Sequence, residues 1–200
     1  VNNYKPTIKI DPKWTTASVG DFCELTYGDT DTAKETGDAR FVRITDIDNS
    51  GLIKNDEIKY VSLTDDNSKY LLKHNDILVA RTGATFGKTL IFKENYPAVY
   101  ASFLIKIDFD HTFLDPFFFW IFTQTLSYWN QANALVTGGG QPQFNSNAIR
   151  QIKVPVPPME IQKEIVSQVK DELSIIDYNK KLIEMFEKKT SNTIKDVWEG

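Results

Sequence analysis

The chain has 200 residues, of which 41% are hydrophobic and 12% aromatic, with a formal net charge of -4. That composition suffices for one domain plus an appendage. The sequence shows no apolar run near the ~20 residues of a membrane span and no secretory leader, so we expect neither a membrane-spanning nor a secreted protein, although Val1 suggests a start inside a longer chain. A single cysteine, Cys23, permits no internal disulfide, so we expect a reducing cytoplasmic location and a small core residue at this position.

Alternating apolar and polar residues predict a series of short strands in the first half of the chain. Polar turns such as DNSG and DDNS separate them. The pattern predicts strands over residues 22–27, 40–47, 57–62, 76–81, 88–92 and 102–107. A mixed β-sheet is therefore expected.

Helices are predicted to follow these strands. Asp115 can cap a helix that has Pro116 in its first turn and continues through the aromatic run FFFWIFTQTLSYW. The helical spacing of these aromatics indicates a core helix packed on the sheet rather than a platform for stacking bases. A flexible GGG at 138–140 precedes QPQFN, and Asn145 is expected to cap a short helix through Ile149.

The stretch IKVPVPPMEIQKEI marks the end of the globular body. Its prolines force extended geometry, so a helix can begin only after Pro158. About forty residues at ~1.5 Å each then predict a rod of ~60 Å. Its apolar seam follows a heptad series and predicts a partner helix, although the helix could instead fold back on its own domain. The seam residues are Val166, Val169, Leu173, Ile176, Ile183, Ile194 and Val197.

Several segments in order resemble the DNA specificity subunits of type I restriction-modification systems. They are YKPTIKIDPKW with VGDFCEL, then FVRITDID, NDILVARTGATFGK, YASFLIKI and GGGQPQFNSNAIRQIKVPVPPMEIQKEIV. The resemblance spans nearly the whole chain. It implies an α+β fold in which a target-recognition domain, residues 1–157, is followed by a spacer helix, residues 158–200. In this family the spacer helices of two such units pack as an antiparallel coiled coil.

The resemblance also implies partners. The chain would direct an adenine N6-methyltransferase subunit and an ATP-dependent restriction subunit to a bipartite site on double-stranded DNA. S-adenosylmethionine, ATP and magnesium would belong to those subunits, with no cofactor in this chain. One unit reads half a site, so the second half would come from a longer chain, as the start at Val1 suggests, or from a second copy.

Catalytic interpretations fit the residues poorly. GATFGKT has three residues between its glycines where a P-loop needs four, and a strand pattern follows it. Asp115-Pro116 is similar to the DPPF-type motif of adenine methyltransferases but lacks the second proline, and helix capping explains it better. His74, His111 and Cys23 have no partners at metal or triad spacing. We therefore expect a non-enzymatic protein without a metal site.

Candidate DNA contacts are the side chains that can read base edges or hold phosphates. Arg81 is the candidate base reader of RTGATFGK, although it could instead brace a tight hairpin. Arg40 and Arg43 are expected to share one strand face, which could meet DNA or pair with acidic residues such as Asp46. The remaining candidates are Thr82, Thr85, Lys88, Tyr100, Ser102, Gln141 and Gln143, the last two with a structural role as the favoured alternative.

Charge alone does not indicate DNA binding. Residues 39–93 carry nine basic against seven acidic side chains, whereas residues 158–200 carry seven against nine. Phosphate neutralisation normally supplies much of the affinity for DNA, so other subunits would have to contribute. Two alternatives stay open: a decoy that binds methyltransferase subunits without reading DNA, and the recognition end of a fused restriction-methylation enzyme.

Overall fold

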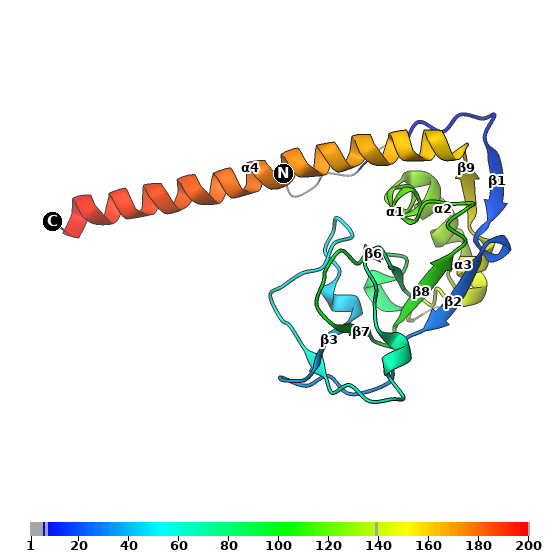
Figure 1. Cartoon of the computed structure of the whole chain (residues 1–200), viewed down its shortest axis with the longest axis horizontal. Coiled ribbons are helices and arrows are strands. Elements are labelled where there is room, and N and C mark those ends of the chain that lie inside the picture. The colour runs from blue at the N-terminus through cyan, green and yellow to red at the C-terminus, as the bar shows by residue number, and fades with distance from the viewer. Residues whose placement is uncertain (1–5, 7, 139, 200) are drawn as a thin grey trace.

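The computed structural model describes residues 6, 8–138 and 140–199, so Tyr4, Lys5, Thr7 and Gly139 of the quoted motifs lie outside the described residues. Figure 1 shows a domain of strands and short helices from which one long helix extends. No helix in the described part is long and apolar enough to cross a membrane. The fold is α+β, as the sequence predicted.

A four-stranded antiparallel sheet lies at the centre of the domain. Its strand order is β2 (Cys23–Tyr27), β8 (Leu104–Phe109), β5 (Ile77–Ala80) and β6 (Thr89–Ile91). The residues of β5 show that apolar side chains pack on both faces of this sheet. Ile77 and Val79 belong to one apolar cluster, whereas Leu78 and Ala80 belong to another. Because alternate residues of a strand point to opposite faces, this sheet is buried on both sides.

A second, three-stranded sheet packs on one face of the first. Its order is β4 (Tyr60–Val61), β3 (Ala39–Val42) and β7 (Ala98–Tyr100), with β3 and β7 parallel. The predicted strands 40–47 and 57–62 are therefore shorter than expected. A 3-10 turn, Ile44–Asp46, takes over directly after β3.

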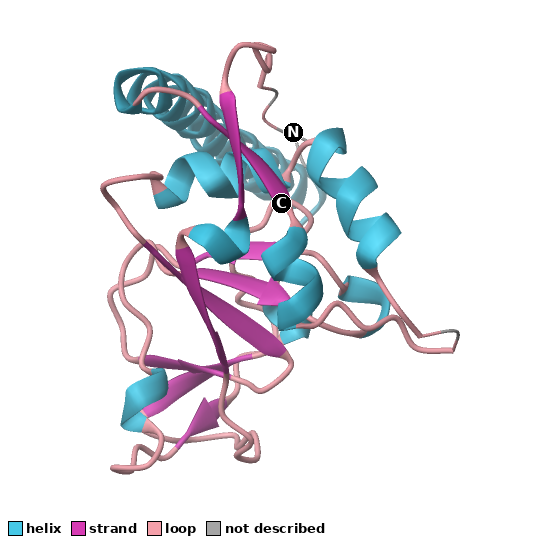
Figure 2. Cartoon of the chain, turned by 90° about the vertical axis from the view of Figure 1, so that its right-hand side faces the viewer, coloured by secondary structure: helices cyan, strands magenta, loops and turns pink. Residues whose placement is uncertain are grey.

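The helices cover the other face of the four-stranded sheet, toward the α4 end of the domain (Figure 2). They are α1 (Pro116–Thr123), α2 (Leu126–Leu135) and α3 (Ser146–Gln151). Asp115 caps α1 as predicted, since its Oδ1 accepts hydrogen bonds from the N–H groups of Phe117 at 2.7 Å and Phe118 at 3.1 Å. All the aromatic residues of α1 are buried, which confirms the core helix and explains the DPF sequence without catalysis.

A small antiparallel ribbon brings the ends of the domain together. Strand β1 (Thr15–Ser18) pairs with β9 (Lys153–Val156), so that Thr15 lies opposite Val156. Directly after β9, α4 (Met159–Glu199) begins where the prolines end and runs for 41 residues. The start of this helix at Met159 agrees with the sequence prediction.

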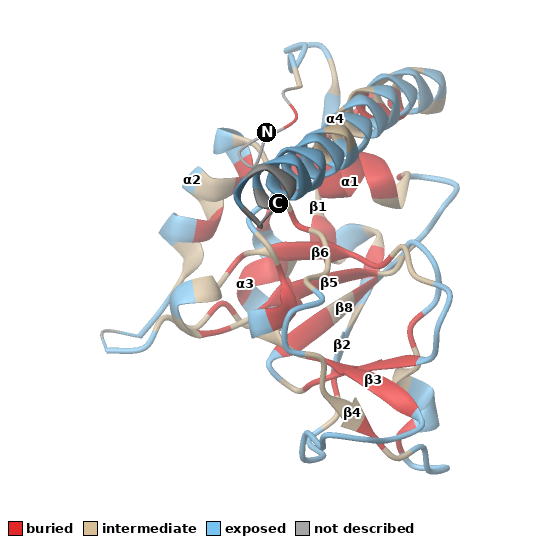
Figure 3. Cartoon of the chain, turned by 90° about the vertical axis from the view of Figure 1, so that its left-hand side faces the viewer, coloured by how far each residue is buried: buried red, intermediate tan, exposed pale blue. Residues whose placement is uncertain are grey.

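One buried side chain joins α4 to the domain. Gln162 is 1% exposed. Its Oε1 accepts a hydrogen bond from the Asp115 N–H at 2.8 Å, and its Nε2 donates to the carbonyls of Phe113 at 3.2 Å and Pro157 at 2.9 Å. The amide is thus satisfied on both sides, and it ties the first turn of α4 to the start of α1. Beyond Leu173 the helix leaves the domain, and its far part is exposed (Figure 3).

Candidate nucleic-acid interface

Two polar motifs that are about sixty residues apart in sequence pack against each other. Gln143 Nε2 donates to Thr82 Oγ1 at 3.0 Å, and the Gly83 N–H donates to the Pro142 carbonyl at 3.1 Å. Thr82 is only 3% exposed, so it lies inside this joint. Gln141 is exposed. Thr82 and Gln143 therefore use their side chains to hold the two motifs together, which is the structural role favoured for Gln143 from the sequence. Gln141 faces solvent.

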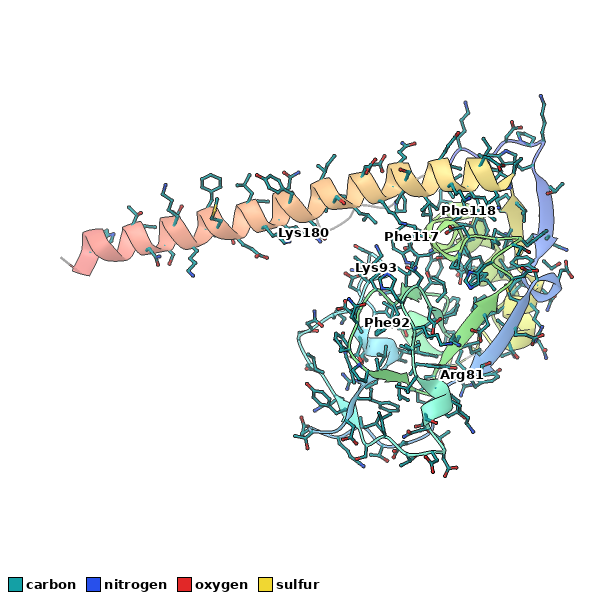
Figure 4. The ribbon with its side chains drawn as sticks, viewed as in Figure 1. Arg81, Phe92, Lys93, Phe117, Phe118 and Lys180 are labelled. Carbon is teal, nitrogen blue, oxygen red and sulfur yellow. The ribbon has the colours of Figure 1, made fainter. Side chains whose placement is uncertain are left out.

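Arg81 lies at the edge of this joint with its guanidinium held in place. Its Nε donates to the Ser102 carbonyl at 2.8 Å, and its Cζ lies 5.3 Å from the ring centroids of both Tyr27 and Phe103. Neither Nη atom makes a hydrogen bond to any described residue. Arg81 therefore braces the turn and still presents the outer edge of its fork, on the side of the domain away from α4 (Figure 4).

The loop after Arg81 depends on two glycines with positive φ, +68° at Gly83 and +75° at Gly87. A Cβ at Gly83 would meet nothing within 4 Å, so only the backbone conformation requires glycine there. A Cβ at Gly87 would lie 3.2 Å from the Trp129 ring, so space is also tight. Strand β6 follows this loop rather than a helix, which confirms that the P-loop interpretation does not hold.

Lys88 lines two adjoining hollows, and Thr85 lines the outer one. The inner hollow, about 210 Å³, reaches Gly51, Gln124 and Trp129, and the outer hollow, about 350 Å³, reaches Thr45 and Lys54. Both share Asp48, Asn49 and Lys88, whose Nζ donates to Asn49 Oδ1 at 2.9 Å. This brings the loop over residues 44–54 beside the loop over residues 82–88.

The two other candidate arginines lie differently from the prediction. Residues three apart in a strand point to opposite faces, and β3 ends at Val42, so Arg40 and Arg43 share no face. Arg43 forms an ion pair with Asp46 at 2.8 Å, the pairing anticipated as the alternative. Arg40 is 4% exposed and donates to Asn55 Oδ1, the Tyr96 hydroxyl and the Lys54 carbonyl. Its guanidinium thus holds loops together inside the domain.

The structure does not present the side chain of Tyr100 to DNA, and it gives its neighbouring candidate Ser102 a backbone contact. Tyr100 ends β7 with 0% exposure, and burial raises the pKa of its hydroxyl. Ser102 lies beyond the strand, where its carbonyl accepts from Arg81. Tyr100 is therefore a core residue, and Ser102 acts here through its backbone.

The heptad seam divides into a docked part and an exposed part. Val166 and Val169 are buried in the domain's own core, and Leu173 packs against it, because the aromatic face of α1 lies beneath them. This corrects the prediction that both valines face a partner helix. Ile176 is half-buried, whereas Ile183 and Ile194 are about half exposed and line a groove with Phe186 and Thr190. The side chain of Val197 lies outside the described residues.

Cys23 and the two histidines lie outside the interface. Cys23 is buried in the core, and burial raises the pKa of its thiol. His74 and His111 are exposed. Among residues 6, 8–138 and 140–199, no group of three His, Cys, Asp or Glu side chains could hold a metal ion.

Comparisons with known proteins identify the family. The model of the type I restriction modification DNA specificity domain matches residues 12–188, which is most of the chain. The chain belongs to this family. Its members are specificity subunits, which recognise DNA and are not catalysts, in agreement with the non-enzymatic prediction. A comparison with curated proteins found no significant match.

Solved structures of the family share the fold. An S subunit of the type I restriction-modification system from M. genitalium has a TM-score of 0.63 at 17% identity, over 91% of this chain and 45% of that one. The HsdS subunit from Thermoanaerobacter tengcongensis gives 0.56 at 17%, over 86% and 41%. A chain from a study of assembly and conformational transition of the type I R-M system gives 0.61 at 16%, over 96% and 47%. This chain spans less than half the length of each.

Most residues of the hollows were not predicted as candidates, among them Asn49, Lys54, Gln124 and Trp129. Asn49 and Lys54 lie in turns that the pattern treated only as connections. Gln124 and Trp129 lie within the aromatic run, whose periodicity indicated a core helix. The break at Thr125, whose hydroxyl caps α2, was the available signal that this run contains two helices.

Proposed function

We propose that this specificity domain reads one half of a bipartite target on double-stranded DNA. It would do so by presenting the loops around Arg81, Lys88 and Gln141 to the duplex. Arg81 supports this proposal most directly, because two rings and one carbonyl orient its guanidinium while both Nη atoms stay available. Arginine in such a fork geometry is suited to guanine or to a phosphate.

The assembly we propose follows from the free half of α4. A second spacer helix would cover the groove lined by Ile183, Phe186 and Ile194, supplied by a second copy or by another part of a longer chain. The resulting pair would hold methyltransferase and restriction subunits in the cytoplasm. S-adenosylmethionine, ATP and magnesium would be bound by those partners.

Substitution of Arg81 tests base reading. Arg81→Ala should weaken binding to the target duplex by about 1–3 kcal/mol, with a smaller loss for unrelated DNA. Arg81→Lys should recover little of the loss, since an ammonium cannot form the fork. Fluorescence anisotropy measures both affinities, and thermal unfolding shows whether each variant keeps its fold. Equal losses of affinity for the two duplexes would show that Arg81 contacts a phosphate or only braces the turn, and does not read a base.

The target itself can be mapped in cells. The chain is co-expressed with the methyltransferase subunit encoded beside it, and N6-methyladenine is located by single-molecule sequencing. A symmetric interrupted motif is expected if two copies pair. Stable copurification without methylation would contradict the recognition proposal for a paired chain and would support the decoy.

A further inference from the structure

The outer hollow has the charge of an anion site. Lys54 and Lys88 both line it, and no hydrogen bond or ion pair joins Lys54 Nζ to any described residue. Asp48 is the one acidic residue among those that line it, and its Oδ1 already accepts from the N–H groups of Ser50 at 2.7 Å and Leu52 at 2.9 Å. Nearby Asp46 is paired with Arg43. The local balance is therefore positive, although the whole chain is acidic.

The loop that carries Lys54 is fixed before any ligand arrives. The Lys54 N–H donates to the Asp46 carbonyl at 2.8 Å, and the Lys54 carbonyl accepts from the buried guanidinium of Arg40. Asp48 and Leu52 close the intervening turn through the Asp48 N–H and the Leu52 carbonyl at 2.9 Å. Because the backbone is already ordered, binding here costs little loop entropy.

Hydroxyl and amide groups surround the two cations. Thr45 and Thr85 line the outer hollow, and each hydroxyl makes only a long hydrogen bond of 3.4 Å, to Asp46 Oδ1 and to the Thr82 carbonyl respectively, which it can exchange for one to an anionic oxygen. Asn49 uses its Oδ1 to hold Lys88 in place, which leaves its Nδ2 without a partner among the described residues. The inner hollow is less suitable for an anion, because Lys88 is the one cation among the residues that line it and Gln124 adds an acceptor oxygen.

We propose that the outer hollow is a socket for one phosphodiester of the DNA backbone, with Lys54 and Lys88 as its cations and Thr45, Asn49 and Thr85 as neutral donors. This inference rests on the proposed function. It adds a contact outside the RTGATFGK motif, and it gives Arg40 a positioning role through the Lys54 carbonyl. The phosphate is the protruding group of a duplex, so a recess fits it better than a base edge within a groove.

The test is the salt dependence of DNA binding by the full chain. The variants are Lys54→Ala, Asn49→Asp, and Lys69→Ala as a matched control, since Lys69 lies over the Tyr70 ring outside both hollows. Each binds a duplex with the mapped motif and an unrelated duplex. We expect Lys54→Ala to lower the slope of log K against log salt by about 0.9 on both duplexes. Asn49→Asp should weaken both, and Lys69→Ala should change neither.

A second series locates the contact. Duplexes that carry one neutral methylphosphonate each are compared between the wild type and Lys54→Ala. One position should weaken the wild type and leave Lys54→Ala unaffected, because the phosphate and its cation act as a pair. The socket proposal would be overturned if the salt slope of Lys54→Ala equalled that of the wild type, or if no methylphosphonate position weakened the wild type alone. In either case, a wild type that still prefers its motif would uphold the proposed function. Failure of the wild type to prefer its motif would overturn the proposed function itself.

Discussion

Lys93 has an unusual environment at the junction of the domain and α4. Its Nζ lies 4.5 Å from the centroid of the Phe117 ring, and Lys170 from α4 lies 5.0 Å from the same ring. Figure 4 places Lys93 and Phe117 beneath the start of α4. Burial lowers the pKa of Lys93, and the charge of Lys170 lowers it further, although Asp177 opposes this. The ring attracts both cations, while the cations repel each other.

The lowered pKa of Lys93 predicts a pH-dependent stability. The folded state binds this proton less tightly than the unfolded state, whose pKa is near 10.5. Stability should therefore rise with pH from the lowered folded value up to about 10.5. Denaturant unfolding of the wild type and Lys93→Met across this range measures the difference. The wild type should gain stability relative to the variant as pH rises, and parallel curves would show that the shift is absent.

At the scale of elements, Gln162 decides how α4 meets α1. Gln162→Leu would leave the Asp115 N–H and the carbonyls of Phe113 and Pro157 without their partner. Each unsatisfied buried group costs about 1–3 kcal/mol, so the variant should lose several kcal/mol. Thermal unfolding measures the loss. Gln168→Leu is a suitable control because Gln168 is exposed on the same helix. Similar stabilities for both variants would contradict the role of Gln162.

The two parts of the seam predict opposite effects of the same substitution. Val169→Asp buries an unpaired charge in the core and should destabilise the domain by several kcal/mol. Ile183→Asp falls on an exposed stretch, so it should leave the unfolding temperature unchanged and abolish assembly. Calorimetry and light scattering separate the two effects. Assembly that survives Ile183→Asp would remove this groove from the partner interface.

Helices and strands could be predicted from the sequence where neighbouring residues alone determine the local structure. The helix starts at Asp115 and Met159 follow from a cap and from prolines, and the strands of the four-stranded sheet follow from alternation. Strand β1 was missed because its polar TTAS sequence gains its structure from β9, far along the chain. Arg40 was misplaced for a similar reason, since Tyr96 and Lys54 fill its surroundings only after folding. The hollows likewise combine loops that no local pattern brings together.

For the whole molecule, the groove on distal α4 predicts concentration-dependent pairing. One match to the specificity-domain family covers residues 12–188, and the chain spans less than half the length of each of these structural neighbours. If two copies pair through α4, light scattering should show a dimer, and removal of residues 180–200 should give a folded monomer. Circular dichroism supplies the control for folding. A truncated chain that still forms dimers would place the interface on the domain instead.

The three hydrogen bonds of Gln162 help to fix the first turns of α4 on the domain, and the rest of this long helix extends from there. The part of α4 beyond Leu173 reaches about 40 Å to Glu199, so a tilt of one degree where the helix leaves the domain displaces its far end by about 0.7 Å. Successive base pairs are about 3.4 Å apart along DNA. A tilt of about five degrees at that point would therefore shift whatever is fixed to the far end by about one base pair.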